Sequence, residues 1–154
     1  MAWPEVAARI EDKVFREADK ASLAMERKAI QLAPKGASEP GLDKSIHGAA
    51  TREGLVIRAR IVCQSPHGAY LEFGTGPAAG HAQYMPPKGV LRQWIRRVLG
   101  IGDEKAIDEA EAAIRWKIYQ KGTEPQPFMK PAFDHVAKKW KGRLAAAVKE
   151  ALRG

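Results

Sequence analysis

Residues 4–32, PEVAARIEDKVFREADKASLAMERKAIQL, carry a long apolar period. Apolar side chains recur there mostly at steps of three and four residues, as on one face of an α-helix; they are Val6, Ile10, Val14, Ala21, Met25 and Leu32. Pro4 suits a first helical turn, and Ala33-Pro34 ends the pattern. The stretch predicts one helix of about 40 Å, long enough to reach another subunit or flank a sheet edge. A break near Ala18 is the alternative.

The next segments predict a loop and then a small sheet. Residues 34–43 mix Pro, Gly and small polar side chains, which is a loop composition. From residue 55 to residue 63 apolar side chains alternate with Arg58 and Arg60, as in a strand with one wet face. Residues 45–49 and 69–73 are candidates to pair with it. We therefore expect an antiparallel sheet of three to four strands.

The second half of the chain predicts a loop and three helices. Residues 74–85 are rich in Gly and Pro and nearly free of charge, which indicates either a mobile loop or a segment that a partner orders. We expect this loop to lack order before assembly. A helix begins at Pro86-Pro87, and its apolar face is Val90, Leu91, Trp94, Ile95, Val98 and Leu99.

The remaining two helices have clear ends. Asp103 can cap a helix whose apolar stripe is Ile107, Ala110, Ile114 and Ile118, and Gly122 suits its left-handed end. The last helix begins at about Pro131 and is marked by Phe133, Val136, Trp140, Leu144, Val148 and Leu152. The sum of the elements predicts a single α+β domain over residues 1–154.

Composition and charge narrow the class of protein. The 154 residues are 45% hydrophobic and 29% charged, as in a globular domain, and no apolar run approaches the ~20 residues of a membrane span. Charged side chains appear from Glu5 on, so we expect no secretory signal, no membrane partner and a cytoplasmic site of synthesis. Cys63 lies in an apolar run and is expected to be a buried small hydrophobe. Residues 128–154 hold seven basic and two acidic side chains, which favours a polyanion or an acidic protein surface nearby.

Two short stretches are the most characteristic motifs of the chain. Residues 70–75 read Tyr-Leu-Glu-Phe-Gly-Thr, and residues 125–132 read Pro-Gln-Pro-Phe-Met-Lys-Pro-Ala. With Gly-Leu-Asp-Lys-Ser-Ile at 41–46 and the order of elements around them, the chain resembles the small neck and tail-completion proteins of long-tailed bacteriophages, the gene-product-ten-like family of lambdoid siphophages. The loop after Pro34 departs from the family pattern, because it is longer, more acidic and lacks a Thr.

The resemblance implies a function in assembly without catalysis. The implied protein is a structural component of the virion at the head-tail junction, assembled in the bacterial cytoplasm. It forms a ring, hexameric by its place in the tail, that joins the connector to the tail and lets DNA pass. Its implied partners are copies of itself, the connector or head-completion protein, and the tail terminator or tail-tube proteins. No cofactor is implied.

Both motifs supply candidate interface residues: Glu72, Phe73, Gly74, Thr75, Tyr84, Phe128 and Met129. Gly74 lets the chain turn sharply, while Phe73 points into the sheet or across an interface. Glu72 is either a solvated carboxylate on an edge strand or the ion-pair partner of a neighbouring subunit. Phe128 and Met129 either anchor a partner or cover the domain's own core.

A nucleic-acid-binding module and an enzyme are the rival hypotheses. The last helix carries Lys138, Lys139, Lys141 and Arg143, which could contact DNA phosphates without reading sequence; basic side chains that only cover a core helix are the alternative. The four histidines lack metal-ligand spacing, and Cys63 with His67 lacks a third catalytic group. The sequence therefore favours an assembly protein over an enzyme.

Overall fold

The computed structural model describes residues 3–35 and 41–153, so half of the predicted loop at 34–43, residues 36–40, lies outside the described residues. Its helices and strands follow in this order: α1 (Trp3–Leu32), the short η1 (Leu42–Ser45), β1 (Ile46–Glu53), β2 (Val56–Cys63), α2 (Pro66–Phe73), the short η2 (Pro77–Ala79), α3 (Arg92–Val98), α4 (Glu104–Lys121) and α5 (Met129–Arg153). The predicted α+β class is confirmed, with a mostly helical content. The described sheet has two antiparallel strands instead of three or four.

The chain divides into two compact units. The first unit consists of Met1–Ala33, Asp43–Gln64 and Phe128–Gly154, and the second of Pro34–Leu42 and Ser65–Pro127. The first therefore contains α1, the β-hairpin and α5, and the second contains α2, α3 and α4. One domain over residues 1–154 stays a prediction.

Helix α1 confirms the long helix predicted from the first apolar period and is unbroken at Ala18. Its buried face consists of small residues and one Met: Ala18, Ala21, Ser22, Met25 and Ala29. The Ser22 hydroxyl donates to the Ala18 carbonyl at 2.9 Å, which satisfies the one polar group on that face. Met25 is therefore the only large side chain among the buried residues of α1.

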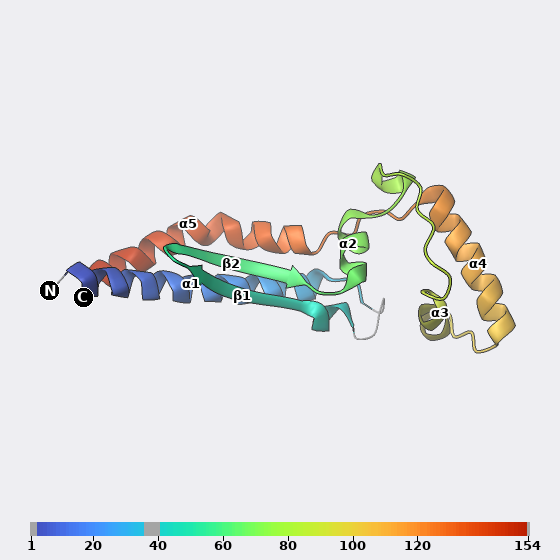
Figure 1. The fold of residues 1–154 in the computed structure, drawn as a ribbon, viewed down its shortest axis with the longest axis horizontal. Helices are drawn as coiled ribbons and strands as arrows, with labels where there is room; N and C mark the ends of the chain where they lie inside the picture. The colour runs from blue at the N-terminus through green and yellow to red at the C-terminus, as the bar shows by residue number, and fades with distance from the viewer. Residues whose placement is uncertain (1–2, 36–40, 154) are drawn as a thin grey trace. The chain divides into compact units, whose positions relative to one another are not determined.

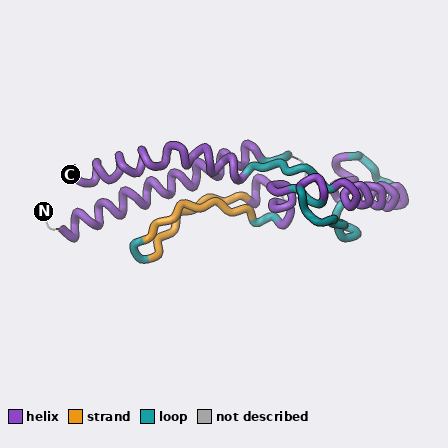
Figure 2. Tube along the Cα trace, turned by 90° about the horizontal axis from the view of Figure 1, so that it is seen from above, coloured by secondary structure: helices purple, strands orange, loops and turns teal. Residues whose placement is uncertain are grey.

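Helix α5 packs antiparallel along α1 (Figures 1 and 2). Its buried residues are also small: Ala132, Val136, Ala147 and Ala151. Polar contacts follow the seam, because the Arg9 guanidinium donates to the Ala151 carbonyl at 2.7 Å and Lys13 pairs with Glu150 at 2.5 Å. The helix pair is thus joined by small side chains in the middle and by ion pairs at its rim.

The hairpin confirms the alternation predicted for residues 55–63. Strand β2 exposes Arg58 and Arg60 and half-buries Ile57, Ala59 and Ile61. The strands pair in register from Ile46↔Cys63 to Glu53↔Val56, so two residues connect them. The first of these, Gly54, has φ of 59°, which is the conformation that a two-residue hairpin turn of type II′ requires.

Strand β1 lies directly on α1 at Gly48. A Cβ atom at this position would stand 2.2 Å from the Ser22 carbonyl oxygen, so only glycine permits the approach. The Gly48 N–H donates to the Glu26 carboxylate of α1 at 2.6 Å. The contact fixes the hairpin on the helix, and Figure 2 shows the two strands on one side of the α1–α5 pair.

A small hydrophobic cluster joins the three parts of this unit. Ala21 and Met25 of α1 and Val136 of α5 form its buried centre. The half-buried Ala59 and Ile61 of β2 pack against them, together with Ala24 and Trp140. Side chains on the inner face of the hairpin therefore complete the core between the two helices.

The expected third strand at 69–73 is wrong, because these residues belong to α2. Ser65 caps the helix by accepting from the His67 N–H at 3.3 Å, and Pro66 occupies the first turn. Gly74, with φ of 70°, ends the helix after two turns. This start signal outweighs the strand propensity of Tyr70 and Phe73.

The other helices differ from their predictions mainly in where they begin and end. Helix α3 begins at Arg92 instead of Pro86, since Gly89 has φ of 96° and interrupts the pattern. The predicted cap of α4 is confirmed, with the Ala106 N–H donating to the Asp103 carboxylate at 2.9 Å. The end of α4 at Gly122 has φ of 76° with an extended ψ instead of a left-handed helical one. Helix α5 begins at Met129 rather than Pro131.

Replacing Gly48 tests the close contact between hairpin and helix. We expect Gly48→Ala to lower the free energy of unfolding by about 2 to 4 kcal/mol, because the new methyl group meets backbone that cannot move aside. Gly142→Ala is the control, since this helical position has nothing within 4 Å and alanine there should be neutral or stabilising by about 1 kcal/mol. Urea unfolding of both variants measures the difference. Equal stabilities would contradict the contact.

Acid unfolding tests the seam between α1 and α5. Hydrogen bonds from Lys20 and then Arg143 hold the pKa of Glu17 below its ordinary value of 4.5. A lowered folded pKa stabilises the protein above the unfolded pKa, and this contribution disappears as the pH falls through the folded pKa. We therefore expect Glu17→Gln to be less stable at neutral pH and to lose less stability between about pH 5 and about pH 3.

The control for this titration is Asp19→Asn, which changes an exposed carboxylate on the same helix. Denaturant unfolding is measured for both variants and the natural chain at several pH values. A slope with pH in Glu17→Gln that equals that of the natural chain would contradict the role of Glu17.

Candidate assembly site

The first motif meets the chain at the start of the second motif within the second unit. Thr75 and Thr123 form an isolated antiparallel bridge, in which each N–H donates to the carbonyl of the other at 3.0 Å and 2.9 Å. Their hydroxyl groups lie 2.8 Å apart and form a third hydrogen bond. Thr75 ends the first motif, and Thr123 lies two residues before the second. The bridge therefore joins parts of the sequence that were predicted separately.

Glycines make this crossing close. A Cβ at Gly122 would stand 2.0 Å from the Thr75 carbonyl oxygen, and one at Gly74 would stand 2.5 Å from the Thr123 carbonyl oxygen. Both residues also have positive φ. Gly74 is thus required by the crossing itself, in addition to the sharp turn that the sequence predicts.

The second motif continues the contact along α2. The Gln126 N–H donates to the Leu71 carbonyl at 2.7 Å, so the backbone after Thr123 runs beside the end of the helix. The prolines at 125 and 127 hold this segment extended. This segment therefore holds the end of α2 in place.

The structure changes the roles expected for Glu72 and Phe73. Both lie in helix α2, so neither belongs to the strand that the sequence predicts. Glu72 is 8% exposed, which makes it a buried carboxylate instead of a solvated one. Phe73 is 65% exposed and does not enter a sheet. Of the two, Phe73 alone remains accessible to a partner.

Phe73, Tyr70 and Tyr84 form what we name the aromatic surface. Tyr70 and Phe73 are three residues apart on α2 and therefore share one side of the helix. The Tyr84 ring stacks on Tyr70 with centroids 5.3 Å apart. The hydrogen bond to Tyr70, followed by burial, raises the pKa of Tyr84 above 10.0. The contact places Tyr84, a residue of the loop predicted to lack order, beside α2.

Phe128 and Met129 lie at the start of α5. Phe128 is fully buried within the chain, and Met129 is half-buried as the first residue of the helix. The alternative in which Phe128 covers the protein's own core therefore agrees better with its burial than a role as an exposed anchor.

Side chains of α4 form hydrogen bonds with the backbone of the segment before α3. No sequence pattern predicts these contacts. Glu111 is 1% exposed, and one carboxylate oxygen accepts from the N–H groups of Gly89 and Leu91 at 2.8 Å and 3.3 Å. One turn later, Arg115 donates to the Pro86 carbonyl at 2.7 Å. A glutamate in an amphipathic helix is usually expected to be solvated, so only the structure shows that Glu111 is buried and bonded to backbone.

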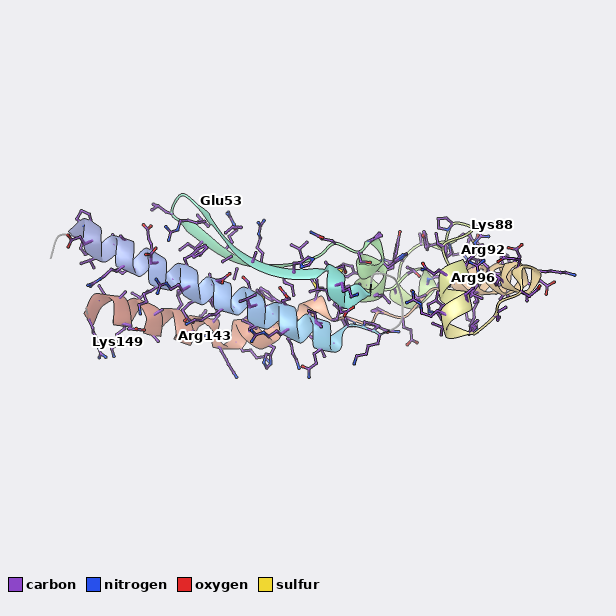
Figure 3. The ribbon with its side chains drawn as sticks, turned by 90° about the horizontal axis from the view of Figure 1, so that it is seen from below. Glu53, Lys88, Arg92, Arg96, Arg143 and Lys149 are labelled. Atoms are coloured by element: carbon purple, nitrogen blue, oxygen red, sulfur yellow. The ribbon has the colours of Figure 1, made fainter. Side chains whose placement is uncertain are left out.

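Ion pairs surround the same segment on its exposed side. Arg92 pairs with Asp108 and Glu104, and Arg96 also pairs with Glu104. Hydrogen bonds from Arg96 and then Arg92 lower the pKa of Glu104. Figure 3 shows Arg92 and Arg96 on the same part of this unit as Lys88. These exposed pairs neutralise much of the positive charge there.

The basic residues predicted for DNA separate into two groups. Lys138, Lys139 and Lys141 are exposed on α5. Arg143 instead donates through two of its nitrogens to the Glu17 carboxylate at 3.2 Å and 3.0 Å, and so belongs to the seam with α1. Figure 3 places Arg143 and Lys149 on the same helix. Any phosphate contact would depend mainly on the three lysines.

Among residues 3–35 and 41–153, no group of three or more His, Cys, Asp or Glu side chains could hold a metal ion. Cys63 is half-buried, and its sulfur lies 3.5 Å from the Ser45 hydroxyl. Over the same residues, no helix has the length and apolar character to cross a membrane.

Comparison of the chain with models of protein families, with curated proteins and with solved structures gives no match. The resemblance to phage neck proteins therefore stays a prediction. So do the predicted interface and DNA-facing residues.

Replacing Gly122 tests the crossing of the two motifs. We expect Gly122→Ala to abolish the Thr75–Thr123 bridge, because the added methyl group would overlap the Thr75 carbonyl. Gly80→Ala is the control, since it also has positive φ but nothing within 4 Å. Amide hydrogen exchange should accelerate at Thr75 and Thr123 in the first variant only. Preserved protection at both threonines in Gly122→Ala would contradict the crossing.

Proposed function

We propose that the chain is a structural virion protein of the head-tail junction of a tailed bacteriophage. In this role it forms a hexameric ring that joins the connector or head-completion protein to the tail terminator or tail-tube proteins. DNA passes through the ring. The family resemblance of the motifs motivates the proposal, and the physical features of the subunit support it.

The supporting observation is the number of large apolar side chains that are exposed to solvent. Each unit exposes several such residues; those in the first include Trp3, Phe133 and Leu152, and those in the second include Tyr70, Phe73 and Trp116. Singly exposed residues are ordinary, but grouped aromatic ones such as the aromatic surface are typical of protein interfaces. A subunit that is completed by its neighbours accounts for this exposure.

The packing of the first unit suits such a part. The two long helices are joined by small side chains and by ion pairs along their length, which limits their relative motion. A stiff subunit loses little conformational entropy when it joins a ring. The stiffness of the helix pair is consistent with a role in assembly.

A DNA-binding module that uses the basic C-terminal helix is the second candidate. The observation in its favour is the exposure of Lys138, Lys139 and Lys141 on one helix. Such contacts are electrostatic and weaken as salt is added. In a ring, the same lysines would touch DNA in passage without reading its sequence.

Sedimentation and electron microscopy of the purified chain test the proposal. We expect rings at high protein concentration, or on addition of the connector or tail-terminator protein of the phage that encodes the chain. Phe73→Ala should raise the concentration needed for half-assembly by about tenfold or more, because exposed aromatic side chains dominate interface energies. Leu55→Ala, at the hairpin tip and 93% exposed, is the matched control and should assemble normally.

Two outcomes would argue against the ring. One is a chain that stays monomeric at all concentrations and binds none of the junction proteins. The other is a tight, sequence-specific complex with DNA at physiological salt, which would favour the DNA-binding module.

A further inference from the structure

We propose that the outer edge of β2 binds an extended segment of another protein, in which apolar and acidic residues alternate. The segment would add a third strand to the hairpin. The inference concerns the first unit alone and holds whether or not the chain forms rings.

The register of the hairpin shows which backbone groups are open. The Gln64 N–H donates to the Ser45 carbonyl at 2.8 Å, so these two residues form a hydrogen-bonded pair that continues the ladder. Because such pairs alternate, Arg58 and Arg60 also direct their N–H and C=O groups toward β1. The N–H and C=O groups of Ile57, Ala59 and Ile61 then point away from β1. Within the described residues, no hydrogen bond reaches these outward groups.

The two edges of the hairpin are not equivalent. On β1, the outward N–H of Gly48 is occupied by the Glu26 carboxylate of α1. Strand β2 has no such cover among the described residues, and its eight residues include no proline. A regular, uncovered edge of this length is a template for another strand.

The face of α5 beside β2 offers an apolar surface beneath such a strand. Trp140 packs in the cluster that contains Ala59 and Ile61, which places it on the hairpin side of α5. Phe133 and Leu144 lie seven residues before and four after Trp140, so they share that side of the helix. Phe133 is 52% exposed, and Trp140 and Leu144 are half-buried. Inward side chains of an added strand would cover these three residues.

Charge on the other face selects acidic side chains. The exposed face of β2 carries Arg58 and Arg60, and a neighbouring strand would place every second side chain next to them. Arg58 pairs with Glu53 at 2.5 Å, whereas no ion pair reaches Arg60 among the described residues. Acidic residues facing outward on the added strand would complement these guanidinium groups. The pattern that fits is therefore apolar inward and acidic outward.

The chain itself does not contain this pattern. No stretch of the 154 residues alternates apolar and acidic side chains over a strand length. Pairing of two β2 edges would place arginines against arginines, which is unfavourable. These facts favour a different protein over a second copy as the source of the strand.

Amide exchange and peptide titration of the full chain test the inference. In the free protein, we expect the amides of Ile57, Ala59 and Ile61 to exchange fast while their neighbours in β2 are protected. A peptide of alternating valine and glutamate should protect these three amides. A peptide with the same composition in two blocks should bind with an affinity lower by about tenfold or more. The same loss is expected for an alternating peptide with lysine in place of glutamate.

Two variants separate the backbone and charge contributions. Ala59→Pro removes one outward N–H without breaking the hydrogen bonds between β2 and β1, so the variant should keep the fold. Its affinity for the alternating peptide should fall about tenfold. If this variant unfolds, methylating the peptide nitrogens that face β2 makes the same test on the natural chain. Arg60→Glu should reverse the preference from the glutamate to the lysine peptide.

Three results would overturn the inference. The first is equal binding of the alternating and block peptides. The second is a peptide preference that Arg60→Glu leaves unchanged. The third is protection of the three amides that rises with protein concentration and without peptide, which would assign the edge to a second copy.

Discussion

The close contact of α1 and α5 through small side chains is the constraint on which the first unit depends. Alanines on both helices let the two backbones approach, so that Arg9 of one reaches the Ala151 carbonyl of the other. Met25 is the one large apolar side chain on the buried faces of the two helices; the other buried side chains there are small. Phe133 and Leu152 of α5 lie outside these faces, each more than half exposed. The exposed apolar surface follows from the way the helices pack.

Local signals allowed part of the fold to be predicted. The apolar period of α1, the alternation of β2 and the cap at Asp103 each depend on neighbouring residues, and all three are confirmed. The strand expected at 69–73 was wrong although its decisive signal was also local. Ser65-Pro66 is a helix start, and it outweighed the strand propensity of the aromatic residues that follow. On α5, hydrophobicity ranked Phe133 above Ala132, whereas the distance between helices selected the alanine.

The candidate site was less predictable because it is made of contacts distant in the sequence. The bridge between Thr75 and Thr123 joins two segments that each read as a loop, and no local pattern specifies their pairing. Glu111 satisfies backbone donors of a segment some twenty residues away, and its own neighbours give no sign of that role. Gly122 was the available clue. Its place after the apolar stripe of α4 predicts a helix end, although a close backbone approach requires glycine equally well.

The unequal edges of the hairpin bear on how such a subunit avoids uncontrolled association. If both edges were open, hairpins of successive copies could pair in an unlimited row. The Glu26 carboxylate covers the Gly48 N–H in the middle of one edge, and the arginines of β2 repel a second β2 on the other. A row of identical chains is thus blocked at both edges. An acidic strand meets neither obstacle, and after it has paired with β2 the described part of the chain has no second open edge of the same kind to extend the sheet.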